Sequence, residues 1–256
     1  METQGKTAIV TGGASGLGRA TVVRLHAAGM NVGIIDRNAE AARGLAAELG
    51  ERARAAVADV TSAEALAAAV DELAGGFGAV HVGVSCAGVG AAVRTLSKHG
   101  PMDLGLFETV VRINLVGTFN LIRLAAARMA QNTPDAGGER GVLVNTASVA
   151  AFDGQVGQAA YAASKAGIAG MTLPIARDLA RHGIRIMTIA PGLFDTPLLG
   201  MLPAEQREKM AQSVPFPTRL GRPAEFAELA LHIVANPMLN GEVIRLDGAL
   251  RLGQLG

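Results

Sequence analysis

The chain has 256 residues, of which 50% are apolar and 18% are charged, and its formal net charge at pH 7 is +1. This composition excludes a disordered chain, and the charge argues against nucleic acid or an anionic membrane surface as a main partner. With a single cysteine, Cys86, and no uninterrupted apolar run of membrane-spanning length, the sequence predicts a cytoplasmic protein with one domain over residues 1–256.

Short β-branched runs alternate with longer Ala-rich stretches of helical spacing. The expected strands are 6–13, 31–36, 54–60, 80–88, 141–148, 184–192 and 241–248. The expected helices are 18–29, 39–50, 62–76, about 104–131 and 158–182. Strands that alternate with helices pair in parallel through right-handed crossovers. We therefore predict an α/β protein with a doubly wound, mostly parallel seven-stranded sheet, a Rossmann fold, which binds ligands at the carboxyl ends of its strands.

The segment 11–18, TGGASGLG, connects the first predicted strand to the first predicted helix. Gly12, Gly16 and Gly18 let the backbone turn tightly and approach a ligand without a clash from a Cβ atom. The helix that follows offers unpaired N–H groups and the positive end of its dipole to a pyrophosphate. A tight turn without a ligand is the alternative, but the strand–loop–helix context favours a dinucleotide cofactor.

Two carboxylates follow the next two predicted strands. Asp36 comes after Gly18 at close to the spacing of about 20 residues at which an acidic residue meets the adenosine ribose. Its charge would repel the 2′-phosphate of NADP, so Asp36 favours NAD, although Arg37 is able to accommodate such a phosphate. Asp59 is expected either to accept a hydrogen bond from the adenine amino group or to cap the next helix.

The stretch 161–165, YAASK, holds the only tyrosine of the chain and one of its four lysines. Tyr161 and Lys165 are four positions apart, so a helix places them on one side. A free phenol has a pKa of about 10, and a nearby ammonium lowers that pKa because it favours the phenolate. We therefore expect a general acid/base pair for an alcohol, with the Ser148 hydroxyl holding the substrate oxygen. Taken singly, Tyr161 would be interpreted as a core residue and Lys165 as a solvated charge.

The chain resembles the short-chain dehydrogenase/reductase family over essentially its whole length. The matching residues are Thr11, Gly12, Gly16, Gly18, Asp59, Ala87, Gly88, Asn114, Ser148, Tyr161, Lys165, Pro191 and Gly192. The resemblance implies that Tyr161 exchanges the proton, that Ser148 orients the reacting oxygen, and that Lys165 binds the nicotinamide ribose. It also implies that Asn114 holds a water in a proton relay; an ordinary polar residue inside a helix is the alternative.

The resemblance implies a nicotinamide cofactor, and Asp36 indicates that it is NAD. The residues expected to bind it are Gly12, Ser15, Gly16, Leu17, Gly18, Asp36, Asp59, Val60, Cys86, Ala87, Gly88, Tyr161, Lys165, Pro191, Gly192 and Thr196. One departure is that residues 85–88 read SCAG where the family has NNAG, which leaves this turn less well braced. Cys86 is expected to be a packed residue rather than a nucleophile, because no activating base is evident. No metal site is expected.

Three segments, 154–180, 186–199 and 240–251, are similar to the type 2 3-hydroxyacyl-CoA dehydrogenases, also called type 10 17β-hydroxysteroid dehydrogenases. That group carries NCAG, so Cys86 is then expected. The similarity implies an acyl-CoA substrate, with hydroxysteroids and other secondary alcohols as further substrates. It also implies an extended segment, here 91–105, in which Arg94, Lys98 and His99 either meet the phosphates of CoA or belong to a solvated loop.

The segment 193–217 mixes apolar residues with prolines. It predicts a mobile lid over an apolar substrate or a helical hairpin at a subunit contact. The residues expected to contact the substrate are Ser148, Gln155, Tyr161, Phe194 and Leu198. The helix at 158–182 is rich in small residues: Ala162, Ala163, Ala166, Gly167, Ala169 and Gly170. Small side chains allow close contacts between helices of different subunits, so a homotetramer is expected. The alternative is that these residues only fit the helix onto the sheet.

Two other functions remain as alternatives. A 3-oxoacyl-carrier-protein reductase shares the fold and the three catalytic residue types but typically uses NADPH, which Asp36 disfavours. A non-catalytic dinucleotide-binding scaffold would keep the glycine loop without needing Ser148, Tyr161 and Lys165 together.

Overall fold

The computed structural model describes residues 1–200 and 202–253. Within them, seven strands form one parallel sheet in the order β3-β2-β1-β4-β7-β8-β9. The strands are β1 (Thr7–Thr11), β2 (Asn31–Asp36), β3 (Ala53–Val57), β4 (Val82–Ser85), β7 (Gly141–Thr146), β8 (Ile184–Pro191) and β9 (Val243–Leu246). The predicted doubly wound sheet is confirmed, and its order reverses between β1 and β4, where such folds open a crevice.

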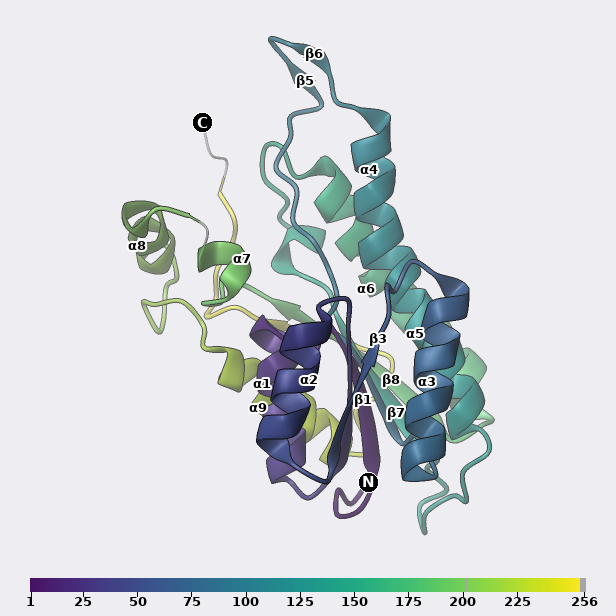
Figure 1. Cartoon of the computed structure of the whole chain (residues 1–256). Coiled ribbons are helices and arrows are strands. Elements are labelled where there is room, and N and C mark those ends of the chain that lie inside the picture. Colours follow the sequence, from purple (N-terminus) through teal and green to yellow (C-terminus); the bar gives the residue numbers. More distant parts are fainter. Residues whose placement is uncertain (201, 254–256) are drawn as a thin grey trace.

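Helices cover both faces of the sheet (Figure 1). One apolar core lies under α1 (Gly16–Ala27), α2 (Ala39–Leu49) and α9 (Pro223–Ala235). A second core lies under α3 (Ala63–Phe77), α5 (Gly117–Met129) and α6 (Ala159–Ala180). The central strands are buried on both faces, which explains why they read as continuous apolar runs rather than as alternating patterns.

The long helix predicted at 104–131 is divided into three parts. They are α4 (Leu104–Val111), a turn of π-helix, η1 (Arg112–Val116), and α5. The combined segment, Leu104–Met129, is long and apolar enough to cross a membrane by length and composition alone, but 50% of its most apolar window is buried inside the protein. A core helix of a soluble protein passes the same test, so this segment is weak support for a membrane span.

Several elements were not predicted from the sequence. They are the hairpin of β5 (Leu96–Ser97) and β6 (Gly100–Pro101), the 3₁₀ turn η2 (Val149–Ala151) and α9. Two further helices, α7 (Pro197–Gly200) and α8 (Ala204–Gln212), lie in the segment 193–217, where a helical hairpin was one of the two predicted alternatives. The sequence did contain a start signal for α9, because Pro223 stands in its first turn. In the structure, the Arg222 N–H donates to Glu225 Oε2 at 2.7 Å and caps this helix. The hairpin, α7 and α8 project beyond the carboxyl ends of the strands (Figure 1).

Candidate active site

A cleft of about 690 Å³ lies at the carboxyl ends of the central strands. Every residue predicted to bind the cofactor lines it, from the glycine loop after β1 to Thr196 after β8. The fold therefore brings residues from six separate parts of the sequence to one surface, while their binding to a cofactor stays a prediction.

The glycine loop is held against the turn that follows β4. Gly12 has φ +64°, and a Cβ atom on it would lie 2.7 Å from the backbone nitrogen of Ala87. A side chain at this position would therefore push the two loops apart. The next helix, α1, begins at Gly16, and Ser15 is its N-cap residue. The Ser15 side chain makes no hydrogen bond to the described residues of this helix. The first N–H groups of α1 thus stay available to an anion, as a pyrophosphate cradle requires.

Asp36 ends β2 at the edge of the cleft. Its two carboxylate oxygens accept hydrogen bonds from the backbone N–H groups of Ala14, at 3.1 Å, and Asn38, at 3.0 Å. The carboxylate is therefore fixed in place beside the glycine loop. Arg37 is exposed and also lines the cleft, so both groups that bear on the choice between NAD and NADP are present.

Asp59 lines the cleft but does not cap a helix. Its Oδ1 accepts hydrogen bonds from the backbone N–H of Thr61 at 2.8 Å and from the Thr61 hydroxyl at 2.7 Å, and these bonds lower the pKa of the carboxyl. The cap of α3 is Ser62, whose hydroxyl accepts from the N–H of Ala65. The alternative that Asp59 caps this helix is wrong, and its role toward adenine stays a prediction.

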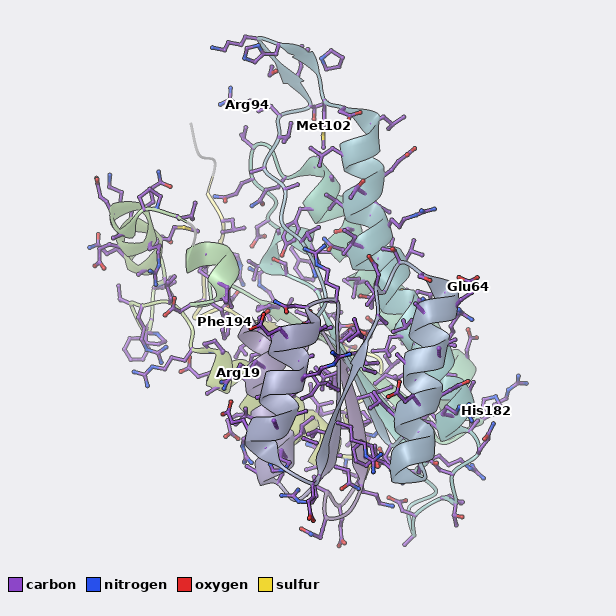
Figure 2. All side chains as sticks on the ribbon, in the orientation of Figure 1. Arg19, Glu64, Arg94, Met102, His182 and Phe194 are labelled. Carbon is purple, nitrogen blue, oxygen red and sulfur yellow. The ribbon has the colours of Figure 1, made fainter. Side chains whose placement is uncertain are left out.

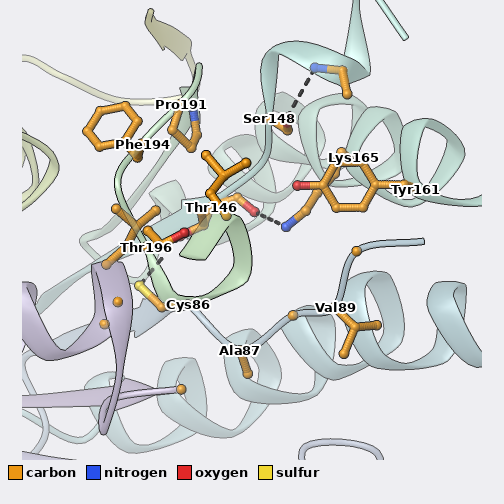
Figure 3. A pocket seen from close by; sticks show the side chains of 18 of the residues that line it. Cys86, Ala87, Val89, Thr146, Ser148, Tyr161, Lys165, Pro191, Phe194 and Thr196 are labelled. Atoms are coloured by element: carbon orange, nitrogen blue, oxygen red, sulfur yellow. Dashed lines mark hydrogen bonds between the residues drawn. The ribbon is translucent and has the colours of Figure 1, made fainter. Parts of the chain in front are cut away.

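Ser148, Tyr161 and Lys165 lie together on one wall of the cleft (Figure 3). Ser148 follows β7 and precedes η2, and its Oγ accepts from the N–H of Ala150 at 3.1 Å. Tyr161 and Lys165 lie in the first two turns of α6, as the spacing predicted. The Lys165 Nζ donates to the carbonyl oxygen of Thr146 at 2.8 Å and lies 5.7 Å from the centre of the Tyr161 ring.

The expected lowering of the Tyr161 pKa by Lys165 is wrong for this structure. Burial raises the pKa of Tyr161, and a hydrogen bond with Ser148 opposes that rise only in part. Lys165 contributes little because its ammonium points at the Thr146 carbonyl, and burial lowers the pKa of Lys165 itself to about 8. Around neutral pH, the site therefore holds a protonated phenol beside a mostly charged ammonium.

Cys86 follows β4 and lines the cleft beside these groups. Burial raises the pKa of its thiol to about 11, although a hydrogen bond from Thr146 Oγ1 and the charge of Lys165 oppose the rise. The thiol is protonated at neutral pH, which agrees with the expectation of a packed residue rather than a nucleophile.

Asn114 lies in η1, fully buried, and is not among the cleft-lining residues in the described part of the chain. Its Oδ1 accepts from the N–H of Val89 at 2.8 Å, and its Nδ2 donates to the carbonyl oxygen of Val89 at 3.0 Å. The same Nδ2 donates to Ser164 Oγ at 3.0 Å, and Ser164 in turn donates to the Tyr161 carbonyl at 2.7 Å. Asn114 thus braces the turn after SCAG against the catalytic helix, while its water relay stays a prediction.

The predicted substrate residues are placed unequally. Four of them line the cleft: Ser148, Gln155, Tyr161 and Phe194. In Figure 3, Phe194 lies beside Pro191, and Tyr161 lies on the opposite side of the pocket. Phe194 is only 6% exposed, and its ring packs into the core under α1 and α9, so it forms part of the floor of the cleft. The side chain of Leu198 lies outside the described part of the structure.

Sequence reasoning missed other lining residues. They are Val89, Gly90, Ala91 and Ala92 after β4, Leu199, Leu202 and Met210 in or between α7 and α8, and Leu252 after β9. Their apolar or small side chains carry no chemical signal, and only the fold shows that they face the cleft. Ser164 was also missed, although it stands inside the YAASK stretch.

Comparisons with known proteins agree with this geometry. Residues 6–207 match the family model described as short chain dehydrogenase. The chain is 55% identical to "3-hydroxyacyl-CoA dehydrogenase type-2" of Bos taurus, over 97% of this chain and 96% of that protein. The crystal structure of 3-hydroxyacyl-CoA dehydrogenase type-2 from Mycobacterium avium superposes with a TM-score of 0.94 at 47% identity, covering 97% of both chains.

A more distant structure is that of a 3-ketoacyl-(acyl-carrier-protein) reductase from Brucella melitensis complexed with NADH. It has a TM-score of 0.87 at 29% identity and covers 97% of this chain and 99% of its own. The family match spans the glycine loop, the Ser148–Tyr161–Lys165 wall and the start of the lid. The chain therefore belongs to the short-chain dehydrogenase family.

Proposed function

We propose that the protein is an NAD-dependent oxidoreductase that interconverts 3-hydroxyacyl-CoA and 3-oxoacyl-CoA, with hydroxysteroids and other secondary alcohols as further substrates. The observation that carries the proposal is the convergence of Ser148, Tyr161 and Lys165 on the wall of a cleft whose other end holds the glycine loop and Asp36. The names of the relatives with 55% and 47% identity support the acyl-CoA ester as substrate.

The residues present fit a nicotinamide dinucleotide. The free N-terminus of α1 and the fixed carboxylate of Asp36 suit a pyrophosphate and an adenosine ribose. When bound, such a cofactor supplies the hydride acceptor or donor. The buried Lys165 ammonium is placed to hold ribose hydroxyls at the far end.

The proton chemistry follows from the three side chains. Ser148 Oγ accepts from the Ala150 N–H and also bonds with Tyr161, so its O–H is placed to turn from the Tyr161 oxygen to a substrate oxygen. For reduction, the raised pKa of Tyr161 keeps the phenol protonated and ready to donate to the forming alkoxide. For oxidation, the Tyr161 oxygen must be a phenolate when it accepts the proton of the substrate hydroxyl, and the hydrogen bond with Ser148 favours that form against the effect of burial.

The acyl-CoA assignment is tested by initial rates with acetoacetyl-CoA, a carrier-protein thioester and a steroid ketone, each with NADH and NADPH. We expect the highest kcat/KM with acetoacetyl-CoA and NADH. A preference for the carrier-protein thioester would favour the alternative reductase, and turnover of none of the three would favour a non-catalytic scaffold.

What supports NAD over NADP is the carboxylate of Asp36. In the variant Asp36→Ala, the ratio of kcat/KM for NADH to that for NADPH should fall by about 10-fold or more, because Arg37 then meets a 2′-phosphate without a competing charge. A wild-type enzyme that prefers NADPH would refute this assignment.

The exposed hairpin β5–β6 and Arg94, two residues before it, are proposed to contact the phosphates of CoA. Figure 2 shows Arg94 beside the hairpin, and the preceding residues Gly90 to Ala92 line the cleft, which gives a continuous surface from the cleft to Arg94. The double variant Arg94→Ala, Lys98→Ala should raise KM for acetoacetyl-CoA a few-fold and leave KM for a steroid ketone unchanged. High salt should weaken the same contribution in the wild-type protein.

The homotetramer also remains a proposal. Ala163, Ala166 and Gly170 are exposed along one face of α6, followed by Leu173, which is 44% exposed. By contrast, a Cβ on Gly167 would lie 2.8 Å from the Leu115 side chain, so this glycine fits α6 onto the neighbouring helix instead. Light scattering at micromolar concentration should give the mass of four chains, and a monomer would contradict the proposal.

A further inference from the structure

The segment after β9 makes a strained turn toward the catalytic loop. Gly248 has φ +61° and Ala249 has φ +67°. A side chain rarely adopts such a φ, so surrounding contacts must hold Ala249 there. A Cβ on Gly248 would also lie 2.7 Å from a Val214 side-chain carbon, which leaves no room for a larger residue.

Arg245 holds this turn through several partners at once. Its Nε donates to Asp247 Oδ2 at 2.8 Å, and its Nη2 donates to Asp153 Oδ2 at 2.6 Å and to the carbonyl oxygen of Leu250 at 2.9 Å. Its guanidinium also lies 5.4 Å from the centre of the Phe152 ring. One partly buried side chain therefore joins β9, the segment after it and the loop that precedes α6.

The segment then reaches the cleft. Leu250 is 2% exposed and anchors it, and Leu252 is one of the residues that line the cleft. The carbonyl oxygen of Gly253 accepts a hydrogen bond from Gln155 Nε2 at 3.1 Å. Gln155 belongs to the loop between Ser148 and Tyr161, so this contact places Leu252 at the catalytic end of the cleft.

We propose that Leu252 is a specificity-determining residue that forms an apolar wall for the acyl part of the substrate, and that Gln155 is a positioning residue that holds this wall in place. The inference rests on the proposed acyl-CoA function. Leu199, Leu202 and Met210 line the same cleft from the segment 193–217, so the acyl chain would contact these residues as well as Leu252. The amide of Gln155 is occupied by the Gly253 carbonyl, so it acts on the substrate through Leu252.

The role of Leu252 is tested by the chain-length preference of two variants. Leu252→Trp should lower the ratio of kcat/KM for 3-oxooctanoyl-CoA to that for acetoacetyl-CoA by about 10-fold or more, because a longer acyl chain meets the added ring. Leu252→Ala should shift the ratio in the opposite direction. The control is Val156→Ala, which truncates a side chain of the neighbouring loop that is 52% exposed. Equal effects of Leu252→Trp on both esters would overturn the specificity role.

The role of Gln155 is tested by hydrogen exchange of residues 249–253, which needs no substrate. Gln155→Glu removes the donor to the Gly253 carbonyl and should speed exchange in this segment while leaving the affinity for NADH unchanged. Gln155→Ala should do the same and should also reproduce the chain-length shift of Leu252→Ala. Unchanged exchange combined with a raised KM would show that Gln155 contacts the substrate directly and would overturn its positioning role. If the wild-type protein turned over neither ester, the proposed function and the Leu252 role would fail together, while exchange would still decide the role of Gln155.

Discussion

The two ends of the cleft are built differently. At the catalytic end, Ser148, Lys165 and Asn114 are 8%, 5% and 0% exposed, and each is attached to a central strand or to a helix packed on the sheet. At the substrate end, α8 has no buried residue within the described ranges, and Leu96 of the hairpin is 72% exposed. The groups proposed to move protons are thus held by the core, whereas α8 and the hairpin, proposed to border the substrate, have few buried contacts.

This difference has a physical reason. Proton transfer requires donor and acceptor to be placed within a fraction of an ångström, which buried, hydrogen-bonded side chains on regular elements provide. Admission and release of a substrate require segments that open at low cost, and few buried apolar contacts make local opening cheap. We therefore expect changes at the catalytic end to act mainly on kcat, and changes at the substrate end to act mainly on KM and selectivity.

The largest effect is expected for Tyr161→Phe. This change removes only the phenol hydroxyl, and loss of a general acid or base costs about 10²–10⁴-fold in rate. NADH affinity, measured by fluorescence titration, should stay as in the wild-type protein, because the ring remains. Turnover close to that of the wild type would refute the role of Tyr161.

Lys165→Met should separate activity from stability. Turnover should fall by about 10²-fold or more, while the folded protein should gain about 1–3 kcal/mol at pH 7, because the charge of a buried ammonium destabilises the fold. Burial lowers the pKa of Lys165 from 10.5 to about 8, so the penalty is fully present below pH 8. Between pH 8 and 10.5 the folded protein releases this proton before the unfolded chain does, and the penalty declines.

The measurement for Lys165 is denaturant unfolding of both proteins at pH 7 and pH 9. The stability advantage of Lys165→Met should be smaller at pH 9 than at pH 7. Cys86 acts in the opposite direction above pH 9, since burial raises its pKa from 9.0 to about 11. Both measurements stay at or below pH 9, where this effect on stability is small. An advantage that grows with pH would contradict the assigned shift.

A smaller effect is expected for Ser164→Ala. The change removes the hydroxyl that joins Asn114 to the Tyr161 carbonyl, so kcat should fall by about 10-fold and the free energy of unfolding by about 1–3 kcal/mol. Ser213→Ala is the matched control, because the Ser213 hydroxyl also donates to the carbonyl three residues earlier, at 2.7 Å, but is exposed. Equal losses in the two variants would mean that Ser164 does no more than satisfy its helix.

The smallest effect is expected at the lid. Arg207 of α8 pairs with Asp195 at 2.7 Å, which joins α8 to the first residues of the segment 193–217. Because exposed ion pairs are worth about 0–1 kcal/mol, Arg207→Ala should raise KM for acetoacetyl-CoA by about 2–5-fold and leave kcat nearly unchanged. Lys209→Ala breaks the pair between Lys209 and Glu205 within α8 and serves as control. A large loss of kcat in Arg207→Ala would show that the lid takes part in positioning the catalytic end.

The parallel seven-stranded sheet and the place of the catalytic residues could be predicted from the sequence because both depend on local patterns. Buried strands that alternate with amphipathic helices form a parallel sheet. The glycine loop at 11–18 is a single connection between a strand and a helix, and Tyr161 and Lys165 lie one helical turn apart, so both can be recognised from neighbouring residues alone. Wherever the chain folds in this way, these groups reach the same edge of the sheet.

Other properties were decided only by the tertiary structure. The pKa of Tyr161 rises because burial outweighs the neighbouring ammonium, and burial depends on everything packed around the ring. The side chain of Asn114 bonds with Val89 and Ser164, which are far from it in sequence. Asn114 lies in a turn of π-helix, which the hydrophobic periodicity of the sequence did not predict. Leu252 faces the cleft only because Arg245 and Gln155 hold a strained turn in place. Apart from the bond between Arg245 and Leu250, these contacts join residues 25 or more positions apart, and their energies depend on distances that only the folded chain sets.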